Sequence, residues 1–124
     1  MRRADVPAMG LAVHLYASDG RWIAWYLPGL PYVWDTGGRW IGWFPWADSA
    51  DQTERGDVLD QHDTYLGTVV GDRLLARTAR RPRPVLTRVP EPQRPVGPPD
   101  VDRALALPPP IGYVDIDARR LSGD

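Results

Sequence analysis

The residues best suited to metal binding or acid–base chemistry are the two histidines and the aspartates near one of them. His62 stands in the stretch DQHD, close in sequence to Asp57, Asp60 and Asp63. A hard metal ion needs spaced oxygen ligands that converge from a loop in which glycine permits a sharp turn, and this stretch has no such loop. We therefore interpret it as a solvated turn, and we predict no metal site and no cofactor. His14 aligns with a tyrosine of a repeated unit described below, which predicts a strand residue.

Patterns that would indicate catalysis are missing from the sequence. It has no cysteine, no P-loop, no G-x-G-x-x-G stretch and no nucleophile elbow. The acidic residues fall mostly in expected turns, so no carboxylate pair can be assigned to general acid and general base. We predict no catalytic residues and a non-enzymatic protein.

Positive charge is concentrated in one stretch. Residues 1–72 contain five arginines and ten acidic residues, whereas residues 73–99 contain seven arginines and a single glutamate. Such a strip can contact phosphates or an anionic lipid surface, and its first members are the candidate contacts: Arg77, Arg80, Arg81 and Arg83. A solvated basic linker, or a contact with the acidic part of the chain or of a second subunit, explains the strip as well. Since the whole chain carries a net charge of −1 and prolines interrupt the strip, we expect no nucleic-acid binding.

The remaining candidates are aromatic, and they belong to a repeated unit. The stretch HLYASDGRWIAWY (14–26) matches YVWDTGGRWIGWF (32–44) at the Gly-Arg-Trp-Ile step and at the following tryptophan. A weaker copy, VLDQHDTYLGTVV, spans 58–70, and a partial one, GDRLLAR, spans 71–77. Repeats at this spacing indicate a supersecondary unit that buries its apolar face only against its neighbours.

Each copy has the pattern of a β-hairpin. Aromatic and β-branched residues flank short polar turns that contain glycine, and Gly or Pro interrupts the chain too often for helices. We predict an all-β fold with turns at Asp19-Gly20, Gly37-Gly38 and Gly71-Asp72, and a polar insertion at 46–57.

Strict alternation along a strand assigns the side chains to two faces. One face then carries a large ring, a small residue and a second large residue in every copy, whereas the Ile23–Trp25 and Ile41–Trp43 pairs lie on the opposite face as core. Rings beside small residues can stack on aromatic ligands, sugars or lipid chains. The candidate ligand-binding residues are therefore Trp22, Tyr26, Trp40, Phe44 and Tyr65. The alternative is that these rings are simply core.

These repeats resemble those of the bacterial "4-fold beta flower" family. The resemblance is carried by SDGRWIAWY, WDTGGRWIGWF, LDQHDTYLG and GDRLLAR, within about residues 11–77. It implies short hairpins that radiate around a pseudo-fourfold centre in a shallow barrel. Two departures are the insertion at 46–57 and a fourth copy that lacks its Gly-Arg-aromatic half. The family has no established activity, so the resemblance implies a fold rather than a function.

Beyond the repeats, the chain becomes rich in proline and arginine. We divide it into a hairpin domain at 1–78, a Pro/Arg-rich linker or tail at 79–110, and a short β-like segment at 111–124. Proline at this density favours an extended chain, and PRPVL and PEPQRP have spacings that aromatic grooves of partner proteins bind. The stretch YVDID aligns on Asp115 with YVWDT, which predicts that it returns to pair with an open sheet edge.

The sequence predicts a cytoplasmic protein without a transmembrane segment, because His14 and the SDG turn end the only apolar patch near the start. We expect a binding or scaffold domain whose aromatic face contacts an apolar or aromatic ligand, a membrane surface or another subunit of a homo-oligomer. The alternative is an adaptor that engages a partner protein or an anionic surface through its Pro/Arg-rich tail.

Overall fold

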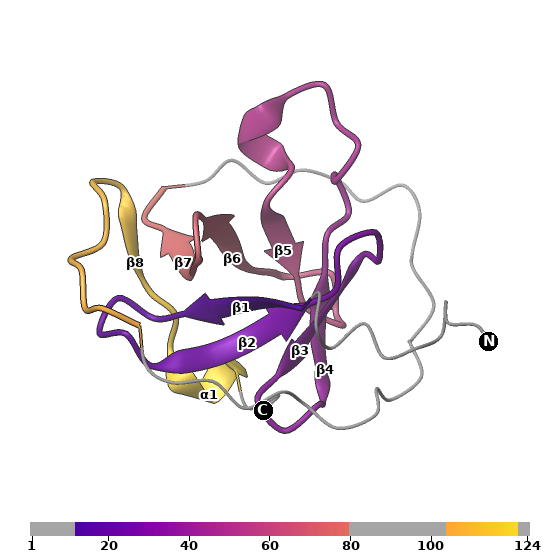
Figure 1. Ribbon diagram of the computed structural model, residues 1–124. Helices are drawn as coiled ribbons and strands as arrows, with labels where there is room; N and C mark the ends of the chain where they lie inside the picture. The colour runs from indigo at the N-terminus through magenta and orange to yellow at the C-terminus, as the bar shows by residue number, and fades with distance from the viewer. Residues whose placement is uncertain (1–11, 80–103, 122–124) are drawn as a thin grey trace.

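The protein is described by a computed structural model over residues 12–79 and 104–121, and it is almost entirely β-structure (Figure 1). The strands are β1 (Val13–Tyr16), β2 (Trp22–Tyr26), β3 (Tyr32–Asp35), β4 (Trp40–Trp43), β5 (Asp57–Leu59), β6 (Tyr65–Val70), β7 (Arg73–Arg77) and β8 (Tyr113–Asp115). A 3₁₀ helix at Gln52–Glu54 and the helix α1 (Ala118–Leu121) complete the elements. The prediction of an all-β fold is confirmed.

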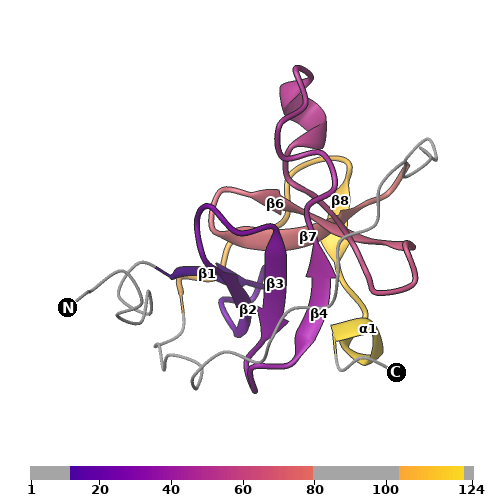
Figure 2. The ribbon, with the colours of Figure 1, turned by 90° about the vertical axis from the view of Figure 1, so that its right-hand side faces the viewer.

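The strands form one sheet in the order β1 to β8, with each strand paired to its neighbours in sequence. β1 also pairs in parallel with β7 through Tyr16 and Arg73, which closes the first seven strands into a barrel. Closure leaves these strands without a long free edge. Figure 2 shows β1 to β4 on one side of the barrel and β6 to β8 across its upper part.

The first three hairpins pair in the same register. An aliphatic residue of the first strand faces a small residue of the second in each of them: Leu15 faces Ala24, Val33 faces Gly42, and Val58 faces Gly67. At Gly42 a β-carbon would lie 2.6 Å from the carbonyl oxygen of Leu59, so the close approach of β5 requires glycine there.

A β-bulge interrupts each of these hairpins one step from that pair. The bulge leaves one extra residue on the second strand, Ile23, Ile41 or Leu66, and all three belong to the buried core. Strict alternation placed each of them on the face opposite to its small neighbour. That prediction was wrong, because an extra residue in one strand shifts every later side chain relative to the partner strand.

The same hydrogen-bonded turn joins the strands of the three hairpins. The amide of Gly20, Gly38 or Asp63 donates to the carbonyl of the residue three positions earlier, at 3.0 Å in every case. These three residues have positive φ angles of 90°, 82° and 62°, a region that favours glycine. Asp19-Gly20, Gly37-Gly38 and Gly71-Asp72 lie in turns, as predicted.

The core lies inside the barrel and draws on every hairpin. Four first-strand residues are fully buried, and they are Leu15 in β1, Val33 in β3, Val58 in β5 and Leu74 in β7. The bulge residues join them, together with Ile116 and Leu121 from the C-terminal segment. The barrel therefore buries apolar side chains contributed by the whole described chain.

The fourth hairpin takes its second strand from the end of the chain. β8 pairs antiparallel with β7, with Ala76 opposite Val114, which confirms that the YVDID stretch returns to a sheet edge. Before β8, residues 104–112 form a strap along the β1–β2 turn, where Ala104 and Leu107 donate to the carbonyls of Gly20 and Ser18 at 2.8 Å. The described part of the predicted tail therefore packs on the barrel.

The polar insertion projects from the barrel between β4 and β5 (Figure 1). Its 3₁₀ helix is capped by Asp51, whose carboxylate accepts from the Thr53 amide at 3.0 Å. None of the residues of this helix is buried, so the insertion adds little to the core.

Candidate functional site

Seven rings cover the outer side of β1 to β4, and we call them the outer aromatic band: His14, Trp22, Trp25, Tyr32, Trp34, Trp40 and Trp43. Pairing between strands places them next to one another, since Trp25 lies opposite both His14 and Trp34, and Trp34 lies opposite Trp40. The band contains five of the six tryptophans of the chain. None of its members belongs to the core cluster inside the barrel.

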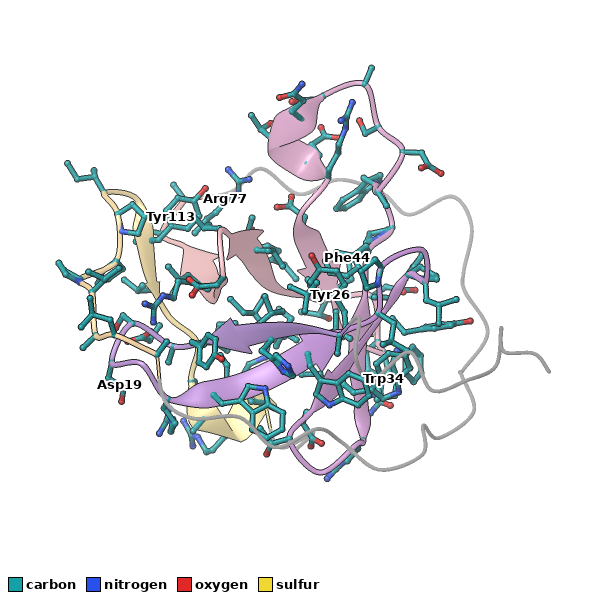
Figure 3. The ribbon with its side chains drawn as sticks, in the orientation of Figure 1. Asp19, Tyr26, Trp34, Phe44, Arg77 and Tyr113 are labelled. Atoms are coloured by element: carbon teal, nitrogen blue, oxygen red, sulfur yellow. The ribbon has the colours of Figure 1, made fainter. Side chains whose placement is uncertain are left out.

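The rings of the band contact one another directly. Trp25 and Trp34 stack with their centroids 5.0 Å apart, and Tyr32 lies 6.0 Å from Trp34 and 6.4 Å from Trp40. At the other end, His14 meets Trp22 edge-on at 5.9 Å. Figure 3 shows Trp34 on the side of the barrel away from β8.

Burial divides the band into a floor and a rim. Trp25, Trp34 and Trp43 are only 1%, 3% and 6% exposed, whereas Trp22, Tyr32 and Trp40 are half-buried. The half-buried rings therefore present the surface that a ligand could reach, and the buried rings hold them in place.

The two half-buried indoles are fixed by the same hydrogen bond. Trp22 Nε1 donates to the carbonyl of Ala24 at 2.8 Å, and Trp40 Nε1 donates to the carbonyl of Gly42 at 2.7 Å. Each indole therefore lies along its own strand with its only donor satisfied. What remains exposed is apolar ring surface, which binds by stacking and dispersion.

Two polar atoms of the band have no hydrogen-bond partner in the described parts of the chain. They are His14 Nδ1 and Trp34 Nε1, and both are buried. Burial lowers the pKa of His14, because the charged imidazolium loses hydration. The neutral form of His14 is thus favoured beside Trp22.

The five predicted ligand-binding aromatics do not share one face. Trp22 and Trp40 lie in the outer band, but Tyr26 and Phe44 pack against the core cluster and contact each other at 5.1 Å. The same burial raises the pKa of Tyr26. The bulges explain the separation, because the extra residue at Ile23 or Ile41 turns the rings on its two sides to opposite faces.

Tyr65 belongs to a polar cluster on β5 to β7. Its hydroxyl donates to Thr68 Oγ1 at 2.6 Å, and Thr68 in turn donates to Asp57 Oδ1 at 2.8 Å. Its oxygen accepts from the backbone amide of Arg77 at 3.0 Å. The Tyr65 hydroxyl therefore forms hydrogen bonds within the barrel, whereas Trp22 and Trp40 belong to the outer aromatic band.

Arg77 lies in the same cluster rather than on an open basic strip. Its Nη2 is 3.3 Å from Asp57 Oδ1, and it also donates to the carbonyl of Thr53 in the insertion. The guanidinium lies 5.6 Å from the centroid of the Tyr113 ring (Figure 3). The other predicted anionic-partner contacts, Arg80, Arg81 and Arg83, lie outside the described residues.

Two arginines beside the band were not among the predicted site residues. Arg21 and Arg39 precede Trp22 and Trp40, both are exposed, and neither forms an ion pair within residues 12–79 and 104–121. The signal that could have identified them is the Gly-Arg-Trp step itself, which occurs twice.

A cavity of about 270 Å³ lies between the strap and the β6–β7 hairpin. Its walls are mainly apolar, and Leu107 and Pro108–Pro110 contribute one side. Its cation, Arg73, is buried and already donates to the carbonyls of Ala17 and Leu105, with Asp72 3.1 Å from its Nε. We interpret the cavity as a packing gap beneath the strap.

Over residues 12–79 and 104–121, no three His, Asp or Glu side chains converge on a point where they could hold a metal ion. The helices of these same residues are too short or too polar to cross a membrane. No family model, curated protein or solved structure matches the chain.

Proposed function

We propose that this protein is a non-enzymatic binding domain whose outer aromatic band recognises an apolar or aromatic ligand. The observation that carries the proposal is the pair of half-buried indoles, Trp22 and Trp40, each held by a hydrogen bond to its own strand. Rings fixed in advance lose little conformational entropy when a ligand binds.

The composition of the band supports a ligand recognised by shape and stacking. The indole donors of Trp22, Trp25 and Trp40 are all bonded to backbone carbonyls. A ligand that depends on several hydrogen bonds would find few partners here. A flat aromatic or aliphatic ligand needs none, because it binds by stacking and dispersion.

A titration with N-phenyl-1-naphthylamine, a neutral aromatic probe, tests this proposal. We expect saturable binding to the full chain, weakened about three- to tenfold by Trp22→Ala or by Trp40→Ala, as for the loss of one aromatic contact. The control is Phe44→Leu, on the inner side of the barrel, which should lower stability and leave probe affinity per folded molecule unchanged. Equal affinity in all four proteins would exclude the band as the binding surface.

An adaptor role through the C-terminal region is the second candidate. The observation that favours it is the exposure of Leu105 and Leu107 in the described part of the Pro-rich region, and of Ile111 directly after it. Pull-down with the full chain and with a Leu105→Asp/Ile111→Asp variant distinguishes this role, since a partner of the tail should be lost only from the variant.

We also propose membership of the 4-fold beta flower family and a cytoplasmic location. The equal register, bulge and turn of three hairpins support the first, together with a fourth hairpin completed by β8. The second rests on the sequence alone. Fractionation of cells that express the tagged full chain tests the location.

A further inference from the structure

The packing gap beneath the strap is large enough to hold a small molecule. Its volume is about 270 Å³, and it lies between the strap and the β6–β7 hairpin. A dry cavity of roughly 150 Å³ in a protein core holds one benzene ring. At the same ratio of volume to atoms, this cavity fits a ligand of roughly ten non-hydrogen atoms, such as a single ring with a short chain.

The walls of the cavity are mainly apolar and come from two separate parts of the chain. Leu75 lines the cavity and is fully buried, but it does not belong to the core cluster inside the barrel. On the strap side, Leu107, Pro108 and Pro110 line the cavity and are exposed. The cavity therefore has a buried apolar end and an end that opens at the surface.

Rigid walls hold the cavity open. On one side, the β6–β7 hairpin belongs to the closed barrel. On the other, the Leu107 amide donates to the Ser18 carbonyl and the Thr78 amide donates to the Gly112 carbonyl, both at 2.8 Å, so the strap is fixed before and after its prolines. Pro108–Pro110 have restricted φ angles and no amide N–H that needs a partner. A preformed apolar cavity binds a ligand without the entropic cost of ordering its walls.

The hydrogen-bond donors in the cavity wall are already bonded within the protein. Arg73 is only 8% exposed, and two of its nitrogens donate to the carbonyls of Ala17 and Leu105. The Ser18 hydroxyl donates to the Asp115 carboxylate. A ligand that presents only acceptors would therefore gain little from Arg73 and Ser18.

Asp72 provides the acceptor of the cavity. Its side chain is 58% exposed, and its carboxylate lies 3.1 Å from Arg73 Nε. A carboxylate has about four lone-pair positions, so the contact with Arg73 leaves room for a further donor. Because the charges of Asp72 and Arg73 balance each other, a charged ligand would add an uncompensated charge beside them. The cavity therefore favours a neutral ligand that donates a hydrogen bond.

We propose that this cavity is a second binding site, which takes a neutral molecule with an aromatic or aliphatic body of roughly ten non-hydrogen atoms and one hydroxyl group. The apolar body fills the space between Leu75 and the prolines of the strap, where it makes the dispersion contacts that the empty cavity lacks. The hydroxyl group lies at the open end and donates to the Asp72 carboxylate.

This site lies apart from the outer aromatic band. Figure 1 shows the strap on the side of the barrel away from β3 and β4. None of the residues that line the cavity belongs to the band. N-phenyl-1-naphthylamine is too large for a cavity of about 270 Å³, so the two sites differ in the size of the ligand that they accept. The inference is therefore independent of the proposed function.

Titration of the full chain with 3-phenylpropan-1-ol, followed by NMR of its methyl and indole groups, tests the inference. We expect saturable shifts at the methyl groups of Leu75 and Leu107, with a dissociation constant of about 0.1–1 mM for a ligand of this size. The indole N–H signals of Trp22 and Trp40 should not change. At pH 7, 3-phenylpropionate should bind about three- to tenfold more weakly, because its carboxylate cannot donate to Asp72 and has the same charge.

Two substitutions fill the cavity from opposite walls: Val70→Phe in the hairpin and Leu107→Phe in the strap. Each should weaken binding at least about tenfold and preserve stability in urea unfolding, since the new ring occupies the place of the ligand. Leu105→Phe is the matched control, because Leu105 is 76% exposed and does not line the cavity. Asp72→Asn should make the carboxylate the better ligand, because it removes the charge that balances Arg73.

An absence of saturable shifts at Leu75 and Leu107 up to about 10 mM alcohol would overturn the inference. So would binding that both filled variants retain, because the alcohol would then occupy another surface; if one filled variant does not fold, the other decides. Equal affinity for the alcohol and the carboxylate, unchanged by Asp72→Asn, would overturn the ligand class. Shifts at Trp22 and Trp40 alone would place the alcohol on the outer aromatic band, which overturns this inference and supports the proposed function.

Discussion

Gly20 and Ala104 are in backbone contact although they lie far apart in the sequence. The Ala104 amide donates to the Gly20 carbonyl at 2.8 Å, and a β-carbon on residue 20 would lie 2.1 Å from the Ala104 oxygen. Gly20 also has a φ of +90°. Turn conformation and close approach of the strap therefore both require glycine at this position.

Replacement of Gly20 by alanine should loosen the strap as well as strain the turn. Gly29 is a matched control, because it has the same φ of +90° but no atom within 4 Å of an added β-carbon. We expect Gly29→Ala to cost about 1–2 kcal/mol from backbone strain. Gly20→Ala should cost more in urea unfolding and should speed hydrogen exchange at the Ala104 and Leu107 amides. Equal costs with unchanged exchange would mean that the strap is not held at Gly20.

The hairpins were predictable from sequence because their signals are local. Both signals, glycine at the turns and the alternation of aromatic and aliphatic residues, lie within a single copy of the repeat. The face of the sheet on which each side chain lies could not be predicted, because a β-bulge adds one residue to a strand without a characteristic sequence signal. The neighbouring large and small residues, Ile23 with Ala24 and Ile41 with Gly42, were the available sign that two successive positions enter the core.

Gly42→Ala tests the close approach of β4 and β5. An added methyl would meet the Leu59 carbonyl oxygen at 2.6 Å and Val58 Cγ1 at 2.7 Å, so one strand must shift. We expect a loss of about 1–3 kcal/mol, as for other overpacked sites. The reciprocal change, Ala24→Gly in the first hairpin, removes a buried methyl and adds backbone freedom. It should cost about 1 kcal/mol without separating strands.

Urea unfolding and amide exchange of β5 measure both changes. Slower or unchanged exchange of the β5 amides in Gly42→Ala would contradict the packing described for the β4–β5 junction.

The polar cluster and β8 could be predicted only in part. Alignment on Asp115 indicated a returning strand, but nothing in the local pattern identifies β7 as its partner. The residues next to Asp57 and Arg77 in the sequence give no sign that these two side chains form an ion pair. Their ion pair arises because β5 and β7 both flank β6 in the sheet, so two residues that lie 20 positions apart in the sequence meet across that strand.

Removal of Arg77 should be among the costly substitutions in this barrel. Asp57 is only 5% exposed, and Arg77→Met would remove the guanidinium that lies 3.3 Å from its carboxylate. We expect a loss of about 3–5 kcal/mol in urea unfolding, because removing one partner of a buried ion pair is strongly unfavourable. Arg77→Lys keeps the charge but cannot reach Thr53, Thr68 and Asp57 together, so its loss should be intermediate.

The double variant Asp57→Asn/Arg77→Met provides the control for this pair. Asparagine still accepts from Thr68 and carries no charge, so the double variant should be more stable than the sum of the single losses by at least about 1 kcal/mol. Additive losses would show that the two side chains do not stabilise each other.

His14 should make stability fall on mild acidification. Burial lowers its pKa below the ordinary value of 6.5, so the unfolded chain takes up a proton at a higher pH than the folded barrel does. Stability rises with pH wherever the unfolded state binds more protons. As pH falls from about 7 through 6.5, the His14 contribution should therefore decline, and it should level off below the folded-state pKa.

His14→Phe removes this titration and keeps a ring beside Trp22, which His14 contacts at 5.9 Å. Because His14 Nδ1 has no hydrogen-bond partner among residues 12–79 and 104–121, the change sacrifices no bond at that atom. We expect the free energy of unfolding between about pH 5 and pH 7 to vary less in His14→Phe than in the wild type. Urea titrations at several pH values measure the difference. A profile unchanged by His14→Phe would mean that the imidazole is as well hydrated in the barrel as in the unfolded chain, and that this end of the band is open to water.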